Sequence, residues 1–183
     1  MANKRKADSL RSRKLVCSAL FLAIAMLLPF LTGQIPEIGK ALSPMHIPAL
    51  LCGFMCGWLW GAGVGFVAPL LRSVVFGMPV MFPTAVAMAF ELAVYGGMAG
   101  FLYHALPRKP WAIYLTLALS MIAGRLVWGG AQAALAGLTG SAFTLSLFLA
   151  GAVTNAVPGI ILQLALIPVL VMAMERTGLS LNQ

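Results

Sequence analysis

Long apolar stretches, interrupted by little except glycine and proline, constrain this chain more than any other feature of its sequence. A run of about 20 apolar residues is long enough to cross the hydrocarbon core of a bilayer as a helix. Lipid offers no hydrogen bonds to the backbone, so a spanning segment must pair its own polar groups, as a helix does. Only 9% of the 183 residues are charged, against about 25% in soluble domains. The chain is therefore predicted to be one all-α membrane domain.

The positions of these stretches predict up to six membrane helices. The first covers residues 15–32, and the polar stretch 33–46 follows it as a loop. Residues 47–71 carry no charge, so they could form one tilted span or two short helices with a break within 57–65. The remaining helices are expected at about 61–76, 84–104, 111–136 and 146–174.

The distribution of lysine and arginine decides between the two alternatives. Six of the twelve precede the first span, Arg108 and Lys109 share one loop, and Arg176 lies near the C-terminus. Basic loops tend to stay in the cytoplasm, and only the two-helix alternative places all nine on one side. We therefore predict a bundle of six helices with cytoplasmic N and C termini. It comprises a basic N-terminal segment (1–14), the transmembrane domain (15–176) and a cytoplasmic tail (177–183).

Three charged residues stand alone in apolar sequence: Arg72, Glu91 and Arg125. A charge inside a bilayer is costly, so it usually faces a cavity, a partner or a ligand. Their chain positions, with those of Asn155 in the last span and His46 at the end of the first loop, indicate the outer half of the bundle. These residues are predicted to bind a polar substrate from outside. Two arginines against one glutamate favour an anionic solute, such as a carboxylate.

Two aromatic residues share a helical face with these charges. Tyr95 follows Glu91 by four residues, and Trp128 follows Arg125 by three, spacings that bring side chains together on a helix. An aromatic surface beside a charge suits a small, partly planar or mixed polar solute. Both aromatic residues are therefore predicted to belong to the substrate site.

Most of the polar candidates also have a structural alternative. Arg72 could extend its side chain to the outer headgroups, and Glu91 could form a bare ion pair with an arginine. Asn155 and Gln163 could hydrogen-bond between helices instead of binding a ligand. His46 could cap the helix that it precedes.

Composition and motifs weigh against several other functions. The basic residues flank apolar spans, so membrane orientation explains the net charge of +8 better than nucleic-acid binding. Cys52 and Cys56 share a helix face but lack the further ligands that a metal site needs. No Ser/His pair or His/Glu cluster indicates catalysis, and no cofactor is expected. The alternative function is an autonomous channel or ion-coupled carrier for a small organic anion, although only Glu91 offers a carboxylate within a span.

Four local stretches carry a family resemblance: LSPMHIPALLCG, GFVAPLLRS, FPTAVAMAFELAVYG and TNAVPGIILQ. Together with the chain length, the six spans, the basic N-terminus and the small-xxx-small motif of Ala19 and Ala23, they extend over essentially the whole chain. The chain resembles the substrate-binding S components of energy-coupling factor (ECF) vitamin transporters, in the pantothenate-type branch.

The resemblance implies a mechanism for the chain. An S component captures a vitamin from outside, under a gate that includes the first loop, in the plasma membrane of a prokaryote. Through Ala19 and Ala23 it docks on a membrane coupling (T) subunit that carries two cytoplasmic ATPases. The chain has no phosphate-binding loop of the form GxxxxGK[ST], so ATP hydrolysis is expected in the partner subunits and not here. Pantothenate is the first candidate among the small vitamins.

Overall fold

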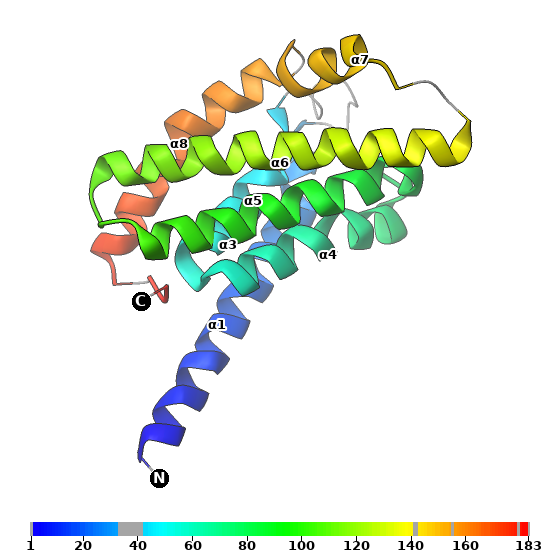
Figure 1. Ribbon diagram of the computed structural model, residues 1–183. Helices are drawn as coiled ribbons and strands as arrows, with labels where there is room; N and C mark the ends of the chain where they lie inside the picture. Colours follow the sequence, from blue (N-terminus) through cyan, green and yellow to red (C-terminus); the bar gives the residue numbers. More distant parts are fainter. Residues whose placement is uncertain (1, 33–41, 141–142, 155, 179, 183) are drawn as a thin grey trace.

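The computed structural model describes residues 2–32, 42–140, 143–154, 156–178 and 180–182, and all regular elements in this part of the chain are helices (Figure 1). In chain order they are α1 (Ala2–Leu27), η1 (Leu28–Thr32), α3 (His46–Cys56), α4 (Trp58–Phe76), η2 (Met81–Ala85), α5 (Val86–Ala105), α6 (Pro110–Thr139), α7 (Leu145–Leu149), η3 (Ala150–Thr154) and α8 (Val157–Arg176). The predicted all-α fold class is confirmed.

Five helical segments among the described residues are long and apolar enough to cross a membrane. They are Asp8–Leu31, Trp58–Phe76, Met81–Ala105, Pro110–Thr139 and Leu145–Arg176. The sixth predicted helix is α3, whose 11 residues extend only about 16 Å at 1.5 Å per residue. Every residue of α3 is buried, so this short helix forms the centre of the bundle and the longer helices surround it.

The break between α3 and α4 falls at Gly57. This residue has φ 99°, a conformation that favours glycine because a Cβ would clash. Its backbone N–H donates to the carbonyl of Gly53 (3.0 Å) and closes the last turn of α3. The structure therefore confirms that residues 47–71 contain two helices rather than one.

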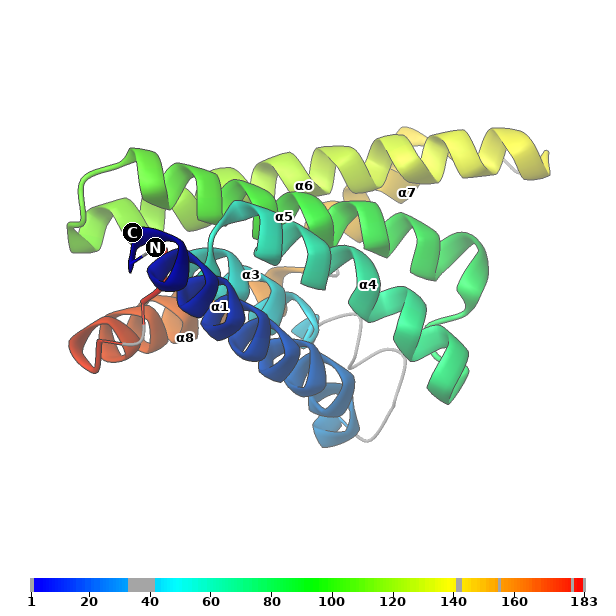
Figure 2. The same ribbon diagram turned by 90° about the horizontal axis from the view of Figure 1, so that it is seen from below.

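One end of the bundle gathers the C-terminal tail and two interhelical connections. The backbone N–H of Leu181 donates to the carbonyl of Met55 at the end of α3 (2.8 Å). The amide of Asn182 donates to the carbonyl of Gly100 on α5 (3.1 Å), and Arg108 donates to the carbonyl of Asn182 (2.8 Å). In the projection of Figure 2 the N-terminus overlaps this end, whereas Figure 1 shows it at the tip of α1, away from the bundle. The cytoplasmic orientation of both termini stays a prediction.

Glycines bring α3, α4 and α5 into backbone contact. A Cβ added to Gly96 of α5 would collide with the backbone of Gly61 on α4, and one added to Gly53 of α3 would collide with the carbonyl of Gly96. Gly65 and Gly100 lie against neighbouring backbone in the same way. Helices in lipid gain little from hydrophobic burial against each other, so small residues that allow close packing become a main source of stability. We call these five residues the glycine junction.

The last membrane segment differs from the prediction of one helix over 146–174. The chain instead forms α7, η3 and α8 in succession. Pro158 lies in the first turn of α8, where its missing backbone N–H has no partner to lose. In the interior of a longer helix, the same proline would remove a hydrogen bond and clash with the preceding turn. Pro158 therefore marks the start of a new helix.

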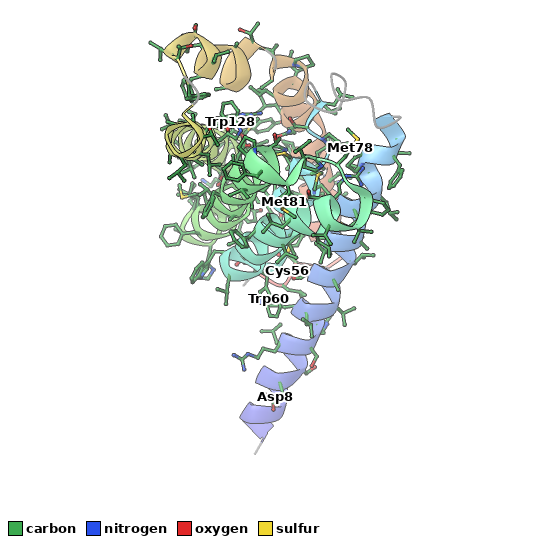
Figure 3. The ribbon with its side chains drawn as sticks, turned by 90° about the vertical axis from the view of Figure 1, so that its right-hand side faces the viewer. Asp8, Cys56, Trp60, Met78, Met81 and Trp128 are labelled. Atoms are coloured by element: carbon green, nitrogen blue, oxygen red, sulfur yellow. The ribbon has the colours of Figure 1, made fainter. Side chains whose placement is uncertain are left out.

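The first helix is longer than expected. α1 begins at Ala2, so the residues predicted as a basic N-terminal segment are helical. Figure 1 shows this part of α1 extending away from the bundle, and Figure 3 shows Asp8 on the extension. The second half of α1 packs against α3 and α4, so α1 is anchored to the bundle along part of its length.

Candidate functional site

His46, Glu91 and Arg125 meet inside the bundle from three different helices. Arg125 Nη1 lies 3.0 Å from Glu91 Oε1, and His46 Nε2 lies 3.4 Å from the same oxygen. Glu91 is 1% exposed and His46 is 3% exposed, whereas the side chain of Arg125 is 16% exposed. A buried carboxylate is strongly unfavourable without a partner, so these contacts favour one arrangement of α3, α5 and α6.

Tyr95 is the fourth member of this group. It follows Glu91 by one turn of α5 and is fully buried. Its ring meets that of His46 edge to face, with the ring centroids 5.0 Å apart, a geometry that aromatic pairs favour. We call His46, Glu91, Tyr95 and Arg125 the central polar cluster.

A glycine allows α6 to complete this cluster. A Cβ on Gly124 would lie 3.2 Å from both the backbone carbonyl of Glu91 and the ring of Tyr95, which is tighter than ordinary van der Waals contact. Without a side chain at this position, the backbone of α6 can lie directly against α5. Arg125, the next residue, is thereby brought within reach of Glu91.

The central polar cluster has unused hydrogen-bonding capacity. Within the described part of the chain, no hydrogen-bond partner is found for Nδ1 of His46, the hydroxyl of Tyr95 or Nε of Arg125. Oε1 of Glu91 and Nε2 of His46 have only the ion-pair contacts given above. Buried polar groups in native proteins nearly always have a partner, so such atoms mark a place that water or a ligand occupies. The cluster combines donors on Arg125 with acceptors on Glu91 and can therefore bind a molecule of mixed polarity.

Three further buried residues have side-chain atoms without a partner among the described residues: Thr116 and Ser120 on α6, and Gln163 on α8. Thr116 and Ser120 precede Gly124 by eight and four residues, so they share the α6 face that packs against α5. Neither hydroxyl stood out in the sequence as a candidate. The four- and eight-residue spacing from Gly124 could have indicated that both hydroxyls face α5. Hydroxyls are common on membrane helices, however, so this spacing alone did not distinguish them as site residues.

Arg72 lies in a separate environment. Its guanidinium group stands over the rings of Phe30 and Phe76, at 4.9 and 5.2 Å from their centroids, and donates to the backbone carbonyl of Met26 near the end of α1. Arg72 is 2% exposed, and none of its described contacts is with the central polar cluster. Its visible role is to join the end of α1 to α4 through cation–π contacts and a hydrogen bond.

This placement of Arg72 changes the charge balance expected from the sequence. The cluster contains one arginine and one glutamate in contact, so their charges offset each other. The expected excess of two arginines over one glutamate is therefore absent from the cluster, and a neutral or zwitterionic polar solute fits it as well as an anionic one.

The aromatic candidate on α6 packs away from the cluster. The indole of Trp128 stacks on Phe148 of α7, with centroids 6.4 Å apart and an interplanar angle of 27°, and meets Phe143 edge to face at 6.1 Å. Figure 3 shows Trp128 where α7 crosses over α6. The structure therefore brings Trp128 together with α7, while Asn155 lies outside the described residues.

Ala19 and Ala23 lie one turn apart on the exposed side of α1. On the same side Leu15 and Leu27 are 57% and 63% exposed, whereas Phe21 is buried against the bundle. A strip of small residues on a membrane helix allows another helix to approach closely. Its use as a docking surface stays a prediction.

A comparison with protein families decides the class of this protein. The family model described as "ECF transporter, substrate-specific component" matches residues 13–171, which include the central polar cluster and the exposed alanines of α1. The chain belongs to this family. No curated protein and no solved structure matches it.

Family membership makes this S component a multi-pass membrane subunit of a transporter, with T and ATPase subunits as partners and a small molecule as substrate. S components are, as a family, transport subunits rather than enzymes. Among the described residues of this S component, no group of three or more His, Cys, Asp or Glu side chains could hold a metal ion. The central polar cluster, built from three helices within the matched residues, is the candidate substrate site.

Proposed function

We propose that this S component captures a small vitamin at the central polar cluster, with pantothenate as the first candidate. The observation that carries the proposal is a set of buried polar atoms, drawn from three helices, that have no hydrogen-bond partner among the described residues. A purely structural ion pair would be expected to satisfy its own polar groups. The unmet groups favour a bound solute instead.

The chemistry of the cluster limits what this solute can be. Arg125 can donate to a carboxylate or carbonyl oxygen, Glu91 can accept from a hydroxyl or amide N–H, and His46 and Tyr95 can do either. Pantothenate carries a carboxylate, an amide and hydroxyl groups, so it matches this mixture. Other small vitamins with both donors and acceptors remain candidates for the same site.

The remaining steps of transport rest on partner subunits. We propose that the S component takes up its vitamin from outside the cell, with the N and C termini in the cytoplasm of a prokaryote. Ala19 and Ala23 then dock on the T subunit, and ATP hydrolysis by two ATPases drives release inside. Trp128 and Asn155 stay proposed substrate residues. Trp128 would contact the solute at the outer entrance to the cluster, where α7 lies against α6.

Docking through α1 can be tested with Ala19→Trp. A bulky indole would keep the partner helix from close approach, at a cost of about 2 kcal/mol, so ATP-driven uptake should fall by more than about tenfold. Vitamin binding by the purified protein should not change, because Ala19 is exposed on the lipid-facing side of α1. The measurement is uptake of labelled vitamin by proteoliposomes that contain all transporter subunits.

The matched control is Ile161→Trp, which places the same indole at a position on α8 that is 63% exposed. Uptake should be normal for this variant. Normal uptake by Ala19→Trp would contradict the docking proposal. Uptake by liposomes that contain only this chain would instead support the autonomous carrier.

A further inference from the structure

A basic cavity lies at the end of the bundle that holds the C-terminal tail, and no residue of the central polar cluster contributes to its lining. It has a volume of about 380 Å³, and Arg108, Lys109 and Arg176 contribute to its lining. The first two residues lie between α5 and α6, and the third is the last residue of α8. Figure 1 shows the α5–α6 connection and the end of α8 on the same side of the molecule. Residues distant in sequence therefore bring three cations to one cavity.

These cations are not neutralised by the protein. None of the three forms an ion pair with a carboxylate in the described part of the chain, where the ion pairs involve Glu91. Arg108 donates to a neutral acceptor, the backbone carbonyl of Asn182. The one carboxylate in the lining, Glu175, accepts a hydrogen bond from the hydroxyl of Tyr103 (2.7 Å). Three cations against one carboxylate leave a strongly positive cavity.

The surroundings of the cavity are those of a lipid–water interface. Ile113 and Met172 give the cavity an apolar inner wall. Trp111, one residue after Pro110, is 51% exposed, and Phe101 on α5 is 59% exposed. Exposed aromatic residues at the end of a membrane helix are typical of the headgroup level. A ligand here would meet cations at its charged end and apolar side chains at its other end.

We propose that this cavity binds the phosphate of an anionic phospholipid, with the glycerol and acyl chains along the apolar side. Basic pockets between membrane helices bind phosphate-bearing headgroups through charge and hydrogen bonds. An acidic soluble ligand would gain from the cations but not from the apolar wall. The site is separate from the vitamin site, so it stands or falls independently of the proposed function.

The test is native mass spectrometry of the full-length protein in detergent, with phosphatidylglycerol as the anionic probe and phosphatidylcholine of the same acyl chains as the neutral probe. Phosphatidylglycerol should bind more tightly. The double variant Lys109→Gln with Arg176→Gln should bind it about twenty-fivefold more weakly, because each basic residue contributes roughly 1 kcal/mol and 1.4 kcal/mol is a factor of ten. Vitamin affinity should be unchanged in this variant.

Two matched variants control for net charge and for folding. Arg11→Gln with Arg13→Gln removes the same charge from exposed positions on α1 and should retain lipid binding. The double variant Lys109→Arg with Arg176→Lys keeps both positive charges and should also retain lipid binding. If Lys109→Gln with Arg176→Gln does not fold, the single variants Lys109→Gln and Arg176→Gln are tested instead. Each should bind phosphatidylglycerol about fivefold more weakly than the wild type.

Three results would overturn the proposal. One is equal affinity for the two lipids, and another is equal loss of binding in the α1 control variant. The third is displacement of phosphatidylglycerol by millimolar inorganic phosphate, since the cavity would then be a site for free phosphate and not for a lipid.

Discussion

Replacing Gly96 by alanine should prevent the bundle from assembling. A Cβ at this position would collide with the backbone of Gly61 on α4, and backbone cannot move aside as the end of a flexible side chain can. Overpacking of this kind costs roughly 3 kcal/mol or more, and α4 and α5 would have to separate to relieve it. We expect loss of monodisperse protein on size-exclusion chromatography and a large fall in thermal stability in detergent.

The matched control is Gly97→Ala, one residue further along α5. A Cβ at Gly97 would lie 3.4 Å from the Cβ of Ala62 and 3.9 Å from the carbonyl of Trp58, which is ordinary van der Waals contact. This variant should fold and bind normally. Equal stability of Gly96→Ala and Gly97→Ala would contradict the role given to the glycine junction.

Replacing Arg125 by alanine should weaken vitamin binding by about thirty- to hundredfold. Removing a charged donor that hydrogen-bonds the solute costs roughly 2–3 kcal/mol of binding free energy when no other group replaces it. About 1.4 kcal/mol corresponds to a tenfold change in the dissociation constant. Some stability should also be lost, because Glu91 loses the partner at 3.0 Å. His46 remains 3.4 Å from the carboxylate, so we expect the protein to stay folded. Isothermal titration of protein shown to be folded measures the effect.

Arg72→Ala provides the comparison that separates binding from packing. Arg72 is as deeply buried as Glu91 but contacts Phe30, Phe76 and the carbonyl of Met26. Its loss should lower the melting temperature while leaving vitamin affinity within about twofold, a difference of less than 0.5 kcal/mol. A large loss of affinity in Arg72→Ala with none in Arg125→Ala would reverse the assignment and restore Arg72 as the substrate residue.

Much of the fold follows from hydropathy, because a segment that crosses lipid must pair its own backbone polar groups, as a helix does. Hydropathy alone left two alternatives open for residues 47–71, one helix or two. There the positive-inside rule predicted two helices, and Gly57, with its positive φ of 99°, forms the break. The sequence also indicated that Glu91 could pair with an arginine, since isolated opposite charges within membrane helices tend to pair, but it did not distinguish Arg125 from Arg72.

Other features depend on tertiary packing, which a single sequence does not reveal. Arg72 appeared equivalent to Arg125 as a lone charge in an apolar span, and only the approach of Phe30 and Met26 from another helix distinguishes it. Trp128 shares a helix with Arg125, but the fold of α7 over α6 supplies Phe148 as its neighbour. The basic cavity likewise required α8 to end beside the α5–α6 connection.

We expect the central polar cluster to hold a vitamin. The most direct test is native mass spectrometry of gently purified protein, followed by titration of a vitamin panel into the wild type and into Arg125→Ala. We predict that a small molecule co-purifies with the protein, and pantothenate is the first candidate. It should bind tightly and saturably to the wild type and far more weakly to Arg125→Ala. A different vitamin with the same pattern would change the substrate but keep the site. No binding of any vitamin to folded wild-type protein, or equal binding to both proteins, would contradict the account.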